Sequence, residues 1–272
     1  MALAPWRQRL QTLSDQDLWF LVTTFADRRT DHDRIVELVR DKPDFLDVML
    51  EDEKLFRRLA SDQEAVVKVS PFFLFSVLLR QARRDLGDRS FVLETEGRDR
   101  IPVFAADHLR ALLEDEEIRD YLAEMLASFV RTQTTTVYFR RRGAWYRHRF
   151  SDLDLDDLAT LAEWVEEEFR FPFYKRSGDV ALFIPGIFPE HAPPRSGLPR
   201  GRRRRRSLED YEEAGRHFYR LAASHPAAEG SGYSAVLERL SVHVGDVRRL
   251  LNFLSDRYLR PQRMHWFLAP TA

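Results

Sequence analysis

The sequence predicts a mainly helical α+β fold with two small β-hairpins. With 272 residues, of which 44% are hydrophobic, the chain is long enough to bury a sizeable core. Most of its apolar residues recur at helical spacing, and two β-prone segments each surround a turn-like centre. We expect four regions, which are short helices over residues 1–69, a core of helices and hairpins over 70–190, a Pro/Arg-rich basic linker over 191–206, and a C-terminal helical hairpin over 207–272 that packs on the body.

Helix start signals dominate the first region. Ser14 and Asp17 form a variant of the capping box, and Ser61 and Glu64 form the complete pattern. Pro43 ends a predicted helix between them. Apolar residues follow each start at helical spacing but show no fixed longer period. We therefore predict separate short helices rather than a regular solenoid.

A longer, buried helix is predicted after Ser70, which has the residue type of an N-cap and is followed by Pro71 at the first helical position. The helix begins with "PFFLFSVLL" and is apolar nearly all round there, which is typical of a helix inside a fold. Gly87 is its natural end. The elements expected next are a hairpin or two short strands over 90–104, helices over about 105–114 and 116–130, and a second hairpin over 134–150.

The element order over residues 70–150 resembles the winged helix-turn-helix arrangement, in a stretch that covers about a third of the chain. The resemblance implies that the second hairpin is a wing, whose basic residues neutralise phosphates and whose aromatic residues stack on bases or sugars. The residues of this candidate nucleic-acid site are Arg140, Arg141, Arg142, Trp145, Arg147 and Arg149.

The helix that a winged-helix protein would insert into a groove argues against this use. Four consecutive acidic residues, Glu114 to Glu117, stand at its start and would face phosphates with like charge. Acidic residues at this position also complement the positive end of a helix dipole. The alternative is an amphipathic surface hairpin in which Tyr138, Trp145 and Phe150 pack on the core while the arginines are solvated.

The second half of the chain is also predicted to be helical. A helix starts at Ser151, and the acidic residues of "SDLDLDD" lack the glycine and the closing glutamate of a calcium loop, so we expect them to cap this helix and fill its first turn. The remaining elements are a short apolar helix over 177–189, the basic linker, and two helices over 208–223 and 233–259 that form the C-terminal hairpin.

Five consecutive arginines, Arg202–Arg206, end directly before the helix start at Ser207. Residues 190–206 carry seven arginines and one glutamate, so this stretch has a net charge of +6 in a chain whose net charge is −1. Cations before a helix N-terminus oppose the helix dipole, whereas free backbone N–H groups and adjacent guanidinium groups together attract anions. We predict an anion-binding site, with a solvated charge run as the alternative. Its residues are Arg200, Arg202, Arg203, Arg204, Arg205 and Arg206.

The sequence offers no motif for catalysis, cofactor binding or metal binding. The absence of cysteine excludes disulfides, thiolate metal sites and cysteine nucleophiles. No G-x-G-x-x-G, P-loop, G-x-S-x-G or H-E-x-x-H pattern occurs. Glu94 and Glu96 share one face of a predicted strand and are a remote candidate for a metal-dependent enzyme, but no companion aspartate and lysine follow at a recognisable spacing. We therefore predict no catalytic residue, no cofactor and no metal ligand.

The leading functional prediction is a non-enzymatic cytoplasmic interaction protein whose partner is nucleic acid or an acidic protein surface. The N-terminal residues lack the apolar run of a signal peptide, and the longest apolar stretches, 69–79 and 180–189, are too short to span a bilayer, so no membrane partner is expected. A helical scaffold or adaptor that binds protein through apolar surfaces, with the arginines incidental, is the alternative. The sequence leaves the oligomeric state open.

Overall fold

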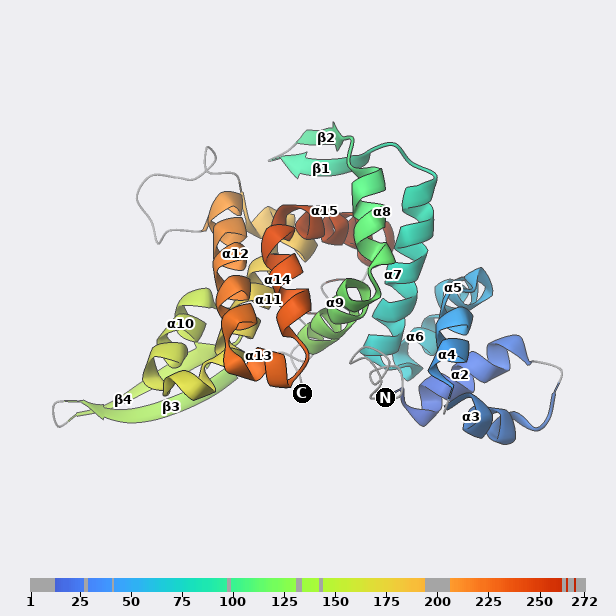
Figure 1. Ribbon diagram of the computed structural model, residues 1–272, viewed down its shortest axis with the longest axis horizontal. Coiled ribbons are helices and arrows are strands. Elements are labelled where there is room, and N and C mark those ends of the chain that lie inside the picture. The colour runs from blue at the N-terminus through green and yellow to red at the C-terminus, as the bar shows by residue number, and fades with distance from the viewer. Residues whose placement is uncertain are drawn as a thin grey trace. The chain divides into compact units, whose positions relative to one another are not determined.

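Figure 1 shows the computed structural model of the chain, which describes residues 13–26, 29–40, 42–96, 99–130, 134–141, 144–193, 206–260, 263 and 267. The chain forms two compact units. Unit 1 consists of Met1–Phe91 and Phe104–Val130, and unit 2 consists of Val92–Val103 and Arg131–Ala272. The first hairpin therefore interrupts unit 1 in sequence but belongs to unit 2. The boundaries of these two units differ from those of the four regions expected from the sequence, and the four regions stay a prediction.

Unit 1 is built from helices in its described residues. Ser14 and Asp17 form the predicted capping box at its first described helix, and Asp17 Oδ1 also accepts a hydrogen bond of 2.7 Å from Ser70 N. One carboxylate thus ties the starts of two helices together. The helices are α2 (Asp15–Phe25), α3 (His32–Arg40), α4 (Pro43–Leu50), α5 (Glu53–Ser61), α6 (Gln63–Lys68), α7 (Pro71–Gly87), α8 (Ala106–Glu114) and α9 (Glu116–Phe129).

Helix α7 is the central helix of unit 1 and packs against α8 and α9. As predicted, Ser70 caps it by accepting a hydrogen bond from Phe73 N, and Pro71 occupies its first turn. Its residues Phe73 to Ala82 are all buried, which confirms the expected position inside the fold. Buried apolar side chains of this helix and α9 form about half of the core of unit 1 among its described residues.

Unit 2 is organised around one long helix, α11 (Phe171–Ile187), which packs against α10 (Leu155–Trp164), α12 (Leu208–Ser224) and α15 (Val244–Leu254). The sequence predicted only a short helix over 177–189, so it underestimated the length of the central helix of this unit. The smaller helical pieces are η1 (Glu167–Phe169), η2 (Pro189–His191), α13 (Pro226–Gly230), α14 (Ser234–Val242) and η4 (Ser255–Leu259).

The strands of unit 2 form two separate antiparallel pairs. Strand β1 (Val92–Glu96) pairs with β2 (Asp99–Val103), and β3 (Thr134–Arg141) pairs with β4 (Ala144–Ser151). The predicted class, α+β and mainly helical, is thus confirmed. The winged-helix resemblance is unconfirmed, because α8 and α9 belong to unit 1 whereas β3 and β4 belong to unit 2.

The C-terminal region differs from the predicted two-helix hairpin. Helix α12 packs against α14 as such a hairpin would, but the expected helix over 233–259 is divided at His243 into α14 and α15, and a π-helical turn follows. The division lets α15 pack against α11 while α14 stays against α12. Among the described residues, no helix has both the length and the apolar character that crossing a bilayer requires.

Candidate nucleic-acid interface

The register of strands β3 and β4 determines which face of the second hairpin each predicted site residue occupies. Arg140 pairs with Trp145, Tyr138 with Arg147, and Thr136 with Arg149. Paired residues of an antiparallel ladder share a face, and successive residues alternate between faces. One face of this hairpin therefore carries Thr136, Tyr138, Arg140, Trp145, Arg147 and Arg149.

The opposite face of the hairpin carries Phe150. This residue is buried, with its ring 5.3 Å from the Trp164 ring of α10 in an edge-to-face arrangement. Arg141 falls on this second face, so it is separated from the other site arginines. The register places Phe150 on the other face from Tyr138 and Trp145, and the alternative in which these three residues pack on the core stays a prediction.

The arginine segment, which we define as residues 194–206, has both of its ends fixed on unit 2. Leu208 N donates a hydrogen bond of 3.1 Å to Pro193 O, so the chain leaves and returns at one place. Ser207 is buried and forms a capping box with Asp210 at the start of α12. Of the predicted site residues, Arg142, Arg200 and Arg202–Arg205 lie outside the described residues, whereas Arg206 is described.

Arg206 is held against the first turn of α10. Its Nη2 atom lies 2.7 Å from Asp156 Oδ1, and its side chain is 31% exposed while that of Asp156 is 85% exposed. Burial raises the pKa of the nearby Tyr211 phenol, and the positive charge of Arg206 partly opposes this rise. The described end of the tract is therefore docked on unit 2 and paired with a carboxylate.

The turn that holds Arg206 also holds the end of β4. Asp157 Oδ2 accepts a hydrogen bond of 2.8 Å from Ser151 N, and Asp154 caps α10 through the N–H groups of the next two aspartates. Asp152 pairs with Arg176 of α11 at 2.8 Å. The expectation that these acids cap a helix and fill its first turn is confirmed, although the cap is Asp154 rather than Ser151.

The end of β4 and Arg206 are both bound to the first turn of α10. Ser151 ends β4 on the same face as Arg149 and Arg147, and alternate strand residues are about 6.6 Å apart. The basic face of the hairpin thus starts beside the turn to which Arg206 is bound. We call this set of residues, Arg140, Arg147, Arg149 and Arg206, the basic track.

Helix α9 does not present a surface suited to reading a groove. Its residues Ile118 to Ala123 are buried, including Arg119 and Asp120. Asp115 caps it by accepting hydrogen bonds from Glu117 N and Ile118 N, so the acidic start has a structural role, in agreement with the dipole argument.

Glu94, the remote candidate for enzyme chemistry, has both carboxylate oxygens engaged by arginines of α15. Arg248 Nη2 donates to Oε1, and Arg249 Nε donates to Oε2 at 2.9 Å. Burial alone would raise the pKa of Glu94, but these two guanidinium groups outweigh it and hold the pKa below its usual value. The ion pairs attach the first hairpin to α15 and give no support to a metal-binding role for this carboxylate.

A pH dependence follows from the lowered pKa of Glu94. The ordinary pKa is 4.5, so the ion pairs contribute fully to stability above that pH and lose their contribution as the pH falls through the lower folded value. We expect Glu94→Gln to lower the melting temperature of unit 2 at pH 7, and the gap to the unmodified protein to narrow below about pH 4.5. Glu64→Gln, in an exposed pair with Lys68, should leave no gap at either pH. A gap for Glu94→Gln that stays constant down to about pH 3 contradicts the assignment.

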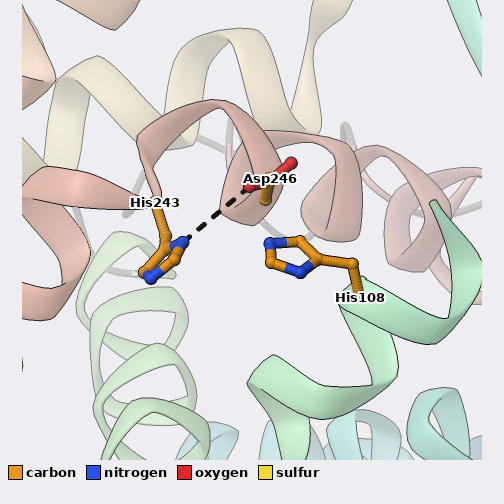
Figure 2. A group of neighbouring side chains, drawn as sticks. All are labelled: His108, His243 and Asp246. Carbon is orange, nitrogen blue, oxygen red and sulfur yellow. Dashed lines mark ion pairs between the residues drawn. The ribbon is translucent and has the colours of Figure 1, made fainter.

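His243 and Asp246 form a weak pair at the start of α15, with His243 Nδ1 3.9 Å from Asp246 Oδ2 (Figure 2). Asp246 also binds Arg249 Nη1 at 3.0 Å. His108, which Figure 2 draws as well, belongs to unit 1 and is exposed. Two side chains from one unit fall short of the three or four protein ligands that zinc sites use, so this pair is interpreted as structural.

The fold and this geometry define a mainly helical α+β protein of two units, whose second unit carries a hairpin with a basic face and, at Arg206, the described end of the arginine segment. Comparison of the chain with protein-family models, with curated proteins and with solved structures found no match. Its function must therefore be argued from the residues themselves.

Proposed function

We propose that this chain is a cytoplasmic interaction protein that binds a polyanion, with nucleic acid as the ligand, through the basic track and the arginine segment. One observation carries the proposal. The first turn of α10 binds both Arg206, through Asp156, and the end of β4, through Asp157, and this attachment of both to one turn supports the proposal.

Charge gives the proposal its physical basis. The arginine segment concentrates positive charge on a chain whose net charge is −1, and guanidinium groups bind phosphate oxygens through paired N–H donors. Each phosphate that is neutralised releases condensed counterions, so binding should weaken steeply with salt. Trp145 and Tyr138 share the basic face of the hairpin, and aromatic residues of this kind stack on nucleic-acid bases.

The experiment is a mobility-shift titration at about 50 mM and about 200 mM salt. The test variant changes Arg140, Arg147 and Arg149 to serine, and a second one changes Arg202–Arg206 to serine. We expect each to bind at least about tenfold more weakly at the lower salt. The log–log salt slope should be shallower by about 0.9 for each phosphate that the variant no longer neutralises.

A charge-matched control separates a site from a general effect of net charge. The control changes three exposed arginines of unit 1 to serine, namely Arg29, Arg57 and Arg110. It therefore removes as many positive charges as the hairpin variant. This control should bind like the unmodified protein. The proposal is wrong if the unmodified protein binds no nucleic acid at the lower salt, or if the control loses as much affinity as the hairpin variant.

Asp156 should compete with phosphate for Arg206. It is exposed and already pairs with that arginine, so a bound phosphate must displace it. We expect Asp156→Asn to bind nucleic acid up to about fivefold more tightly at low salt, which corresponds to the strength of one exposed ion pair. Glu163→Gln, at the other end of α10, makes the same charge change about 10 Å away and should have a smaller effect. Equal effects of the two variants would show that only net charge matters.

A second candidate function, an adaptor that binds protein, is favoured by the exposed apolar side chains of unit 1. Phe45 and Val48 share a face of α4 and are 58% and 70% exposed. If this is the function, changing both Phe45 and Val48 to serine should abolish capture of the partner protein in a pull-down. The two arginine-to-serine variants should still capture it. Changing the equally exposed Phe169 of unit 2 is the matched control.

A further inference from the structure

Two large aromatic residues of unit 2 are exposed at the end of α10 and on the short η1 turn that follows it. Trp164, in the last turn of α10, is 50% exposed, and Phe169 of η1 is 59% exposed. A fully extended chain of five residues spans at most about 18 Å, so one short peptide can reach both rings. Exposed apolar side chains that lie this close together are a candidate interaction surface.

Phe169 is held in place although it is not buried. Its N–H donates a hydrogen bond of 3.0 Å to Glu166 O within the turn. The turn is also held from α13, whose N-cap residue His225 is buried. Ala227 N donates to His225 Nδ1 at 3.2 Å, so the proton of the ring is on Nε2, which donates to Glu167 O at 2.8 Å. A side chain presented by such a fixed turn loses little further freedom when a partner covers it.

The Trp164 ring is fixed as well. Helix α10 packs against α11 and against strand β4 (Figure 1), and the ring lies edge-to-face on the buried Phe150 ring of that strand, with the centroids 5.3 Å apart. Half of the residue nevertheless stays exposed. Unit 2 therefore presents both aromatic side chains in positions that are already set before any partner binds.

Exposed glutamates flank the two rings in the sequence. Within the described part of the chain, no ion pair engages their carboxylates. Glu163 lies in the last turn of α10, where a negative charge opposes the helix dipole. The other three are consecutive, so their charges repel one another, and they precede the first turn of α11, within which a helix dipole would favour them. Local stability does not explain these charges, and positions that break local rules are where function is expected. We call the six residues, Glu163, Trp164, Glu166, Glu167, Glu168 and Phe169, the aromatic–acidic patch.

The chemistry of the aromatic–acidic patch defines what can cover it. A purely apolar partner would cover the rings but leave the adjacent carboxylates partly desolvated and unpaired, and an acidic partner would be repelled. Guanidinium and ammonium groups both pair with carboxylates and stack on aromatic faces, and arginine does so most effectively. The patch is seven residues long in sequence, so an extended segment of about seven residues can follow it from end to end.

We propose that the aromatic–acidic patch binds an extended, arginine- and lysine-rich segment of a partner protein, whose cations pair with the glutamates and stack on Trp164 and Phe169. This inference goes beyond the proposed function and does not depend on it, because the patch shares no residue with the basic track or the arginine segment.

The first test is a fluorescence anisotropy titration of the full chain with a labelled peptide of alternating arginine and glycine, at about 50 mM salt. Changing Glu166 and Glu168 to glutamine together should weaken binding at least about fivefold, the strength of two exposed ion pairs. The matched control changes Glu213 of α12 and Glu238 of α14, which are exposed glutamates of the same unit, and should bind within about twofold of the unmodified protein. Absence of binding, or equal losses in the two variants, overturns the inference.

The second test separates the aromatic contribution from charge. Phe169→Leu keeps an apolar side chain but removes the ring, so it should bind the same peptide about twofold to fivefold more weakly. Phe169→Trp should bind at least as tightly as the unmodified protein, because tryptophan is the best acceptor of a cation. Phe45→Ser with Val48→Ser, on unit 1, should leave peptide binding unchanged. Equal binding by the leucine and tryptophan variants would show that the ring takes no part, and the inference would then be wrong.

A second copy of the chain is the competing occupant. Sedimentation velocity should find the same oligomeric state for the unmodified protein and for the variant with glutamine at Glu166 and Glu168. An oligomer that this variant dissociates would show that another copy covers the patch, against the inference. The mobility-shift titration keeps the two proposals apart, since the same variant should bind nucleic acid no more weakly than the unmodified protein. Peptide binding without nucleic-acid binding means that only the proposed function has failed, and the reverse means that only this inference has failed.

Discussion

Replacing Arg80 with methionine will destabilise unit 1 by about 3–5 kcal/mol, the cost of leaving buried charges without their partner. Arg80 is fully buried in α7. Its guanidinium group hydrogen-bonds Asp47 Oδ1, and its Nη2 atom lies 3.7 Å from Asp120 Oδ1, a second fully buried group. Methionine fills much of the same volume but carries no charge, so the variant isolates the electrostatic loss from the loss of packing.

The surroundings of Arg80 explain why the loss should be large. Arg119 is also buried, and burial lowers its pKa, with the nearby charge of Arg80 acting in the same direction. Asp47 and Glu51 contact both arginines at 3.8 Å or less. Removing the Arg80 guanidinium group takes one positively charged partner from Asp47, Glu51 and Asp120. Hydration cannot replace it at the fully buried Asp120 and can do so only in part at the other two carboxylates.

The measurement is urea unfolding followed by circular dichroism, for Arg80→Met and for Arg83→Met. Arg83 lies one turn along the same helix and pairs with Glu51 Oε2 at 2.7 Å, but its side chain is 29% exposed. Its replacement should cost about 1 kcal/mol or less, as is usual for partly solvated pairs. A loss below about 1 kcal/mol for Arg80→Met, or equal losses for the two variants, contradicts the assignment of a buried ionic core.

Local signals predicted much of unit 1 but missed this ionic core. The caps at Ser14 and Ser70 are bonds between residues three apart, so the sequence alone identifies them. The burial of α7 was equally visible in its apolar sequence. The partners of Arg80 lie 33 and 40 positions away, on α4 and α9, and a single arginine in an apolar helix does not specify them. Such pairs become known only once the helices are packed.

The central helix of unit 2 was underestimated for a different reason. Two prolines and two glycines in α11 are ordinarily signs of irregular structure. Pro172 is compatible with the helix because the N–H groups of the first turn have no partner within the helix. Pro185 lies in the last turn, close to the end of α11. The carbonyls of Pro185 and Gly186 accept hydrogen bonds of 2.8 Å and 2.6 Å from Asn252, and this partner more than sixty residues away has no local signature.

The sequence identified the basic residues of the candidate interface, but it did not show which of them share a face or which partners they have. The alternation of Arg147 and Arg149 is visible in the sequence, and the face that they share with Arg140 follows once the pairing is known. The ion pair of Arg206 with Asp156 joins positions fifty residues apart. The acids at the start of α10 had a sufficient local explanation as the cap and first turn of the helix, so nothing in the sequence marked Asp156 as a partner for the arginine tract.

Gly178→Ala will destabilise unit 2 by about 1–3 kcal/mol, although alanine is favoured over glycine in a helix by about 1 kcal/mol. A Cβ atom at this position would lie 2.7 Å from two ring atoms of Tyr219. The ring is fully buried, and its hydroxyl donates a hydrogen bond of 2.9 Å to Asp179 Oδ1. The ring therefore cannot move away without giving up this bond, and the packing between α11 and α12 must open instead.

Two comparisons make the prediction specific. Gly230→Ala in α13 meets no atom within 4 Å, so it should leave stability unchanged or raise it slightly. In a Tyr219→Ala background the ring is gone, and Gly178→Ala should then cost close to nothing, since the two sites are coupled through a single contact. Urea unfolding of the four proteins of this cycle measures the coupling. If alanine at position 178 costs the same with and without the ring, the close approach of α11 to Tyr219 is not what requires glycine there.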